Sequence, residues 1–164
     1  MSLINKAAAL IIAVTLASPG HGQKPGTPPE DGADVWILDP ADPSVATSGC
    51  SFPVEVDFTG KIKTFSVPGN RTVLTAPGLY ATIINLNDPS KQVTLGVTGD
   101  LKFFNQPDGG FAAIGTGRNL VTDPIYGLTL VIGTFSFAFD GAGNLIQGLT
   151  LHAGRTVSVC SLID

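Results

Sequence analysis

Side chains suited to catalysis are scarce in this chain. It contains two histidines, His21 near the N-terminus and His152 near the end of a predicted strand. A catalytic triad or a zinc site in the folded body would therefore have one imidazole, and no thiolate would be free to assist if the cysteines pair. We interpret His152 as a surface or packing residue. The sequence indicates no catalytic residue, no metal site and no cofactor.

Carboxylates offer a second kind of chemistry. Glu55 and Asp57 share a strand face at i, i+2, an arrangement that would suit the two carboxylates of a glycosidase. A hairpin with a three-residue loop at 58–60 would place Asp57 opposite Lys61 and Glu55 opposite Lys63. These opposite-charge pairs favour a structural role for both acids.

Four polar residues are candidates for ligand contact. Asp100 and Arg118 lie on neighbouring predicted strands, in a register that places them directly across from each other. They are either a cross-strand ion pair or polar groups in the mouth of a barrel. Asp123 and Tyr126 belong to the predicted loop 120–127, the longest connection in the core, which could gate a pocket.

Two turns carry motifs of low specificity. The Asp140–Asn144 loop resembles part of a calcium loop but lacks the downstream acids, so we predict a hairpin turn. Asn70-Arg71-Thr72 is a glycosylation sequon in a predicted turn, and Asn70 would be modified only in a eukaryote.

The two cysteines, Cys50 and Cys160, are predicted to form a disulfide. Such a bridge would close a loop of about 110 residues, which the chain-entropy model relates to about 4–5 kcal/mol of stability. Its geometry would also bring the start of the first core strand beside the last strand. The alternative is two free, buried thiols.

The N-terminus has the pattern of a secretory signal peptide, residues 1–22. Lys6 precedes the apolar run Ala7 to Ala17, which is too short to span a bilayer, and cleavage is expected after Ala17 or Gly22. A short membrane anchor or a buried helix is the alternative. Residues 23–34 form a Pro/Gly-rich segment predicted to be a flexible linker, and residues 35–164 a single all-β domain.

Charge narrows the range of partners. The formal net charge is −4, and removal of residues 1–22 takes away Lys6 and no acid, which leaves eight bases against thirteen acids, or −5. The chain has no cluster of Lys and Arg, so nucleic acid and membrane insertion are not expected, and any partner is unknown.

The domain reads as a series of short strands separated by Pro, Gly, Asn and Asp turns. The predicted strands cover residues 53–57, 61–67, 71–75, 79–86, 92–105, 111–119, 128–139, 144–152 and 155–162. In 128–139, Val131 and Phe135 share one side while Leu128 and Leu130 lie on the other, so a loop or the 35–38 segment is expected to cover the second side. Glycines inside strands indicate sharp coiling. We therefore predict an antiparallel up-and-down barrel of about eight strands, closed by the Cys50–Cys160 disulfide, with a two-sheet β-sandwich as the alternative.

Several segments resemble a family of small secreted β-proteins from actinobacteria. They are Cys50-Ser51-Phe52-Pro53-Val54, Thr59-Gly60-Lys61-Ile62-Lys63, Asn70 to Gly78, Gly117-Arg118-Asn119-Leu120, Phe139 to Leu145 and Val159-Cys160. The resemblance covers roughly residues 50–161 and rests on turns and cysteines. It implies export and the disulfide, and it brings no activity and no functional residues.

These observations predict a secreted, non-catalytic binding or interaction module, with a small hydrophobic ligand in a barrel lumen as one version. A barrel enzyme of the cyclase or isomerase type is the second hypothesis, and it needs Asp100, Arg118 and Tyr126 to converge on one cavity. A structural or cell-surface protein that works through its outer face is the third.

Overall fold

The computed structural model describes residues 28–42 and 48–164, and the predicted signal peptide lies outside them. The described residues form eleven strands and one 3₁₀ turn, so the domain is all-β as predicted. The strands are β1 Glu30–Asp31, β2 Asp34–Leu38, β3 Val54–Thr59, β4 Lys61–Val67, β5 Arg71–Thr75, β6 Tyr80–Asn85, β7 Gln92–Gly96, β8 Asp100–Asn105, β9 Phe111–Asp123, β10 Gly127–Phe139 and β11 Leu145–Ser158, and the turn is η1 Cys160–Leu162. No described helix is long and apolar enough to cross a membrane.

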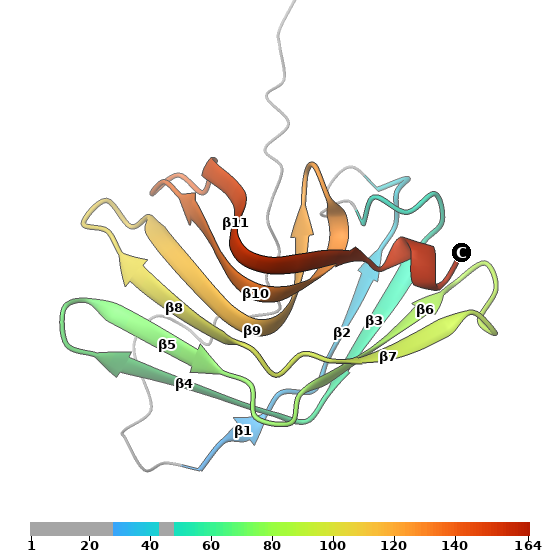
Figure 1. Cartoon of the computed structure of the whole chain (residues 1–164), viewed down its shortest axis with the longest axis horizontal. Helices are drawn as coiled ribbons and strands as arrows, with labels where there is room; N and C mark the ends of the chain where they lie inside the picture. The colour runs from blue at the N-terminus through green and yellow to red at the C-terminus, as the bar shows by residue number, and fades with distance from the viewer. Residues whose placement is uncertain (1–27, 43–47) are drawn as a thin grey trace, which may run out of the picture.

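The strands form two sheets, and extended segments of the chain run from one sheet into the other (Figure 1). One sheet has seven strands in the order β1-β4-β5-β8-β9-β10-β11, and the other has four in the order β2-β3-β6-β7. Only Gly60 separates β3 from β4, so one extended segment leaves the small sheet and enters the large one. Gly60 has φ +124°, and a Cβ there would overlap the Gly78 carbonyl oxygen, which explains glycine at this corner.

The prediction of a closed barrel is wrong. Neither sheet closes on itself, because β2 and β7 are edges of the small sheet and β1 and β11 are edges of the large one. The chain end near β11 forms the η1 turn instead of pairing with β2 or β3. Two open sheets suit the two-sheet alternative.

The predicted hairpin at 58–60 is also wrong. β3 pairs with β2 and β6, whereas β4 pairs with β1 and β5. Glu55 and Asp57 therefore lie on the small sheet, and Lys61 and Lys63 lie on the large sheet. The physical reason is that a strand bent through Gly60 keeps the same alternation of side chains as two strands folded back on each other.

A row of glycines bends the three longest strands. Gly117, Gly133 and Gly154 lie in register across β9, β10 and β11, and each has a positive φ. β9, β10 and β11 curve strongly in Figure 1. The glycines inside strands thus mark sharp bends, as the sequence indicates, within an open sheet.

The core consists of two apolar clusters. The first lies between the sheets and includes Phe58 and Ile83 from the small sheet and Leu128 and Leu130 from the large one. The second belongs to the large sheet and includes Val131, Phe135, Phe137 and Phe139. The two-sided burial expected for the first half of the 128–139 segment is confirmed, and Trp36 of the 35–38 segment packs against the first cluster.

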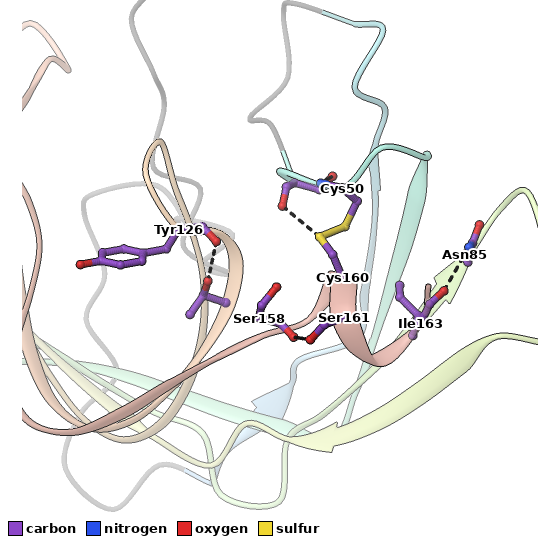
Figure 2. Close-up of a disulfide and its surroundings, with 9 residues drawn as sticks. Cys50, Asn85, Tyr126, Ser158, Cys160, Ser161 and Ile163 are labelled. Atoms are coloured by element: carbon purple, nitrogen blue, oxygen red, sulfur yellow. Dashed lines mark hydrogen bonds between the residues drawn. A yellow bond between two sulfur atoms is a disulfide. The ribbon is translucent and has the colours of Figure 1, made fainter.

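The Cys50–Cys160 disulfide is present, with a Cα–Cα distance of 5.3 Å. Figure 2 shows that it fixes the C-terminal turn to the loop before β3. Asn85 Nδ2 donates to the Ile163 carbonyl over 3.0 Å, and the Val159 amide donates to the Leu128 carbonyl over 3.0 Å. The end of the chain is therefore held by one covalent bond and isolated hydrogen bonds.

We expect the double substitution Cys50→Ser/Cys160→Ser to lower the free energy of unfolding by about 2–5 kcal/mol, since the bridge closes a loop of 110 residues. Urea denaturation of the oxidised protein and the variant measures the difference. Peptide mapping without reductant should yield one peptide pair joined through the two cysteines. A free-thiol signal in folded, air-oxidised protein would contradict the disulfide.

The substitution Gly133→Ala should destabilise the protein by about 2 kcal/mol or more, because φ is +141° and the new Cβ would overlap the Ala153 carbonyl oxygen. Gly96→Ala is the matched control within a strand, since the nearest atom to its Cβ is Tyr80 Cε1 at 3.9 Å. Thermal unfolding of both variants measures the effects. Equal melting temperatures would show that the bend at Gly133 does not require glycine.

Candidate functional site

The structure does not bring Asp100 and Arg118 together as predicted. Asp100 lies opposite Thr116 on β9, and Arg118 lies opposite Ile132 on β10. Arg118 Nε donates to the Gly96 carbonyl over 2.9 Å. Arg118 thus ties β9 of the large sheet to the end of β7 in the small one.

Asp123 is buried within a turn. The predicted loop 120–127 is wrong, because β9 continues to Asp123 and β10 begins at Gly127. The Asp123 carboxylate is 2% exposed and accepts three backbone N–H groups, from Ile125 at 2.8 Å, Tyr126 at 3.2 Å and Leu149 at 3.2 Å. It therefore clasps the tip of the β9–β10 hairpin to β11.

Tyr126 lies at the exposed tip of this hairpin. Its side chain is 50% exposed, and its carbonyl accepts the Thr129 hydroxyl over 2.9 Å. Figure 2 shows the ring pointing away from the disulfide. Ile125 beside it is 83% exposed. The tip is thus an exposed apolar point, away from the buried carboxylate of Asp123.

A cavity of about 20 Å³ lies where the two core clusters meet. Its lining includes Phe58, Leu79, Leu101 and Asn119, and it includes none of the four predicted ligand residues. A space of this size accommodates about one water molecule, whereas small-molecule sites usually measure about 300 Å³ or more.

The Asp140–Asn144 loop joins β10 to β11 as a hairpin turn. The side-chain amide of Asn144 donates to Asp140 Oδ2 over 2.9 Å, and the Asn144 and Ala142 backbone amides donate to Oδ1. These hydrogen bonds, that of the Asn144 side chain first, lower the pKa of Asp140 below its ordinary value. The carboxylate is therefore occupied by its own turn, and no group of three or more metal-binding side chains occurs among the described residues.

Asn70 is exposed in the β4–β5 turn, in line with its predicted turn position. Its φ is +53°, and its side-chain Nδ2 donates to the Asn105 carbonyl over 3.0 Å. The same nitrogen that glycosylation would modify thus helps to fasten the turn.

Ser136, His152 and Gln147 form a cluster that the sequence does not reveal. Ser136 Oγ lies 2.8 Å from His152 Nε2, and Gln147 Nε2 donates to Ser136 Oγ over 2.9 Å. Irregular pairing of β10 with β11 brings the three together, because the register shifts on both sides of Ser136. A serine and an imidazole at this distance have the spacing of a nucleophile and its base. However, His152 is exposed on an open sheet, and no described group hydrogen-bonds its Nδ1.

A second surface feature is the outer face of the large sheet. Side chains in register on β4, β5, β8 and β9 point away from both core clusters. The apolar ones are Phe65, Val73, Phe104 and Ile114, and the cationic ones are Lys63, Arg71 and Lys102. We call these seven residues the basic face.

The cations of the basic face are not neutralised by acids in the described structure. Lys63 Nζ lies 6.0 Å from the centroid of the Phe65 ring, and Arg71 Nε donates to the Pro68 carbonyl. Neither these two residues nor Lys102 forms an ion pair with a described carboxylate. Asp100 is the one acid in β4, β5 and β8, against four bases, and it points to the same side as the cations, in register with Thr75. Alternating apolar and cationic side chains on an uncovered sheet are suited to binding a flat, amphipathic, anionic surface.

Comparisons of the chain with models of protein families, with curated proteins and with solved structures found no match.

We expect Asp123→Asn to lower the free energy of unfolding by about 1–3 kcal/mol, because an amide cannot accept all three buried N–H groups. Asp100→Asn, on the outer side of the same sheet, is the control and should change stability by less than about 0.5 kcal/mol. Urea denaturation measures both. Equal effects would show that the clasp at Asp123 contributes nothing.

Proposed function

We propose that this protein is an exported, non-catalytic interaction module whose working surface is the basic face. The observation that carries the proposal is a sheet surface that no other described strand covers, on which four apolar side chains alternate with three cationic ones that have no described carboxylate partner. Apolar patches of this kind are costly to leave in water and usually mark binding surfaces.

The small size of the interior cavity favours the outer face, and not a lumen, as the working surface. The cavity between the core clusters measures about 20 Å³, which gives a small apolar ligand too little room. The enzyme hypothesis needs Asp100, Arg118 and Tyr126 on one cavity, and none of them lines this one. The third hypothesis of the sequence analysis, a protein acting through its outer surface, therefore has the best support.

Export rests on two features. The N-terminal pattern of residues 1–22 is that of a secretory signal, and the Cys50–Cys160 disulfide is compatible with an oxidising compartment. The resemblance to small secreted actinobacterial β-proteins belongs to the same proposal.

The test is retention on washed cells of the producing organism. Labelled, oxidised protein is compared with the variant Phe104→Ser/Ile114→Thr, which removes the apolar centre of the basic face. We expect at least about a tenfold loss of retention, since two central side chains carry much of the energy of an interface. The control Ile125→Thr/Ile146→Thr removes two apolar side chains that are 83% and 66% exposed elsewhere, and it should bind as the unmodified protein does.

Circular dichroism must first show that both variants are folded. Equal retention of all three proteins, or a loss confined to the Ile125/Ile146 variant, would refute the basic face as the working surface. Native mass spectrometry of secreted material tests the alternative of a ligand site in the interior, because an apolar molecule retained by the protein would favour that site.

A further inference from the structure

The outer face of the small sheet has the opposite charge to the basic face. Its outward side chains include Val35, Ile37, Glu55, Asp57, Tyr80 and Ile84, which we call the acidic face. β2, β3, β6 and β7 contain no lysine and no arginine. The side-chain carboxylates of Glu55 and Asp57 form no hydrogen bond or ion pair with a described residue.

The acidic face also carries large apolar side chains, and no other described strand covers them. Val35 is 54% exposed, Ile37 48% and Tyr80 51%, which are high values for large side chains on a sheet. Val35 lies in register with Asp57, and Ile37 lies in register with Glu55 and Ile84. Each carboxylate therefore has an apolar neighbour on the next strand, which mirrors the arrangement of Val73 beside Lys102 on the basic face.

From these two faces we propose that the partner of the basic face is the acidic face of a second copy of this chain. The proposal rests on the proposed function and names its partner. Sheets pack face to face at about 10 Å, a spacing at which lysine and carboxylate side chains of facing strands can meet. Because two different faces meet, the contact is head-to-tail and leads to a ring or an open chain of copies.

Electrostatics limits the strength of this contact. Each exposed opposite-charge pair is expected to change affinity by a factor of about 1.4 to 5, and the net negative charge of every copy, −4 for the full chain and −5 without residues 1–22, opposes approach. The apolar side chains of both faces must supply the remainder. We therefore expect concentration-dependent association that weakens when a charge is reversed on either face.

Sedimentation velocity with two charge-reversal variants tests the pairing. Lys63→Glu/Lys102→Glu makes both faces acidic, and Glu55→Lys/Asp57→Lys makes both basic. The unmodified protein should gain mass as its concentration rises, and each variant alone should associate at least about tenfold more weakly. An equimolar mixture of the variants should recover the association, because an acidic surface of one then meets a basic surface of the other.

Lys91→Glu/Arg155→Glu is the matched control, since it makes the same change in net charge at exposed positions off the basic face. It should associate more strongly than the Lys63/Lys102 variant at every salt concentration. Equal weakening by both pairs would mean that net charge alone is responsible, and it would overturn the proposal.

Two further outcomes separate this inference from the proposed function. A protein that stays monomeric to millimolar concentration, yet depends on Phe104 and Ile114 for retention on cells, overturns the self-contact and leaves the proposed function standing. Binding of the monomer to phosphatidylglycerol vesicles, lost in Lys63→Glu/Lys102→Glu, would assign the face to an anionic lipid surface instead and also overturns the self-contact.

Discussion

The structure depends on a covalent tie at a place where the two sheets share no strand pairing. β11 is an edge of the large sheet and β2 an edge of the small one, so no ladder joins the last strand to the first ones. The Cys50–Cys160 bond and a few hydrogen bonds hold the end of the chain there. Val159 and Ile163, which flank this tie, are 0% and 1% exposed and belong to the core between the sheets. Loosening the tie would therefore open that core to water, not merely free a terminus.

The large sheet bends sharply enough for its own side chains to pack against one another. The glycine row at 117, 133 and 154 bends β9, β10 and β11, and the Asp123 clasp returns the hairpin tip to β11. The phenylalanines of β10 then pack in one cluster with Val121 of β9 and Val131 of β10. The apolar side chains of this part of the sheet are thus used in packing, and the cavity where the two core clusters meet measures about 20 Å³.

Local features of the sequence predict local features of the structure well. Strands such as 61–67 and 71–75, the turns between them and the two-sided burial of the first half of 128–139 follow from alternation and turn residues, and all are present. The disulfide follows from the cysteine count together with the predicted signal peptide. The assignment of strands to sheets does not follow, because alternation at 54–67 is the same whether Gly60 begins a hairpin or bends one long strand. The sequence predicts Asp123 as a ligand contact in a loop, whereas its role in the turn depends on Leu149, which pairing along three strands brings to it. The Ser136 cluster depends on register shifts that no local pattern encodes.

The same ambiguity at Gly60 decides how charge is distributed over the surface. In a hairpin, Glu55 and Asp57 would neutralise Lys63 and Lys61, and neither face would keep these charges unpaired. In the continuous β3–β4 segment, all four side chains point outward on one extended chain, with the acids before the bend and the bases after it. Four residues separate Asp57 from Lys61 and eight separate Glu55 from Lys63, which is at most about 13 Å and about 26 Å at 3.3 Å per residue, against a Debye length of about 8 Å in physiological salt. Salt therefore weakens the attraction between the acids before the bend and the bases after it, and the two faces of the molecule differ in charge.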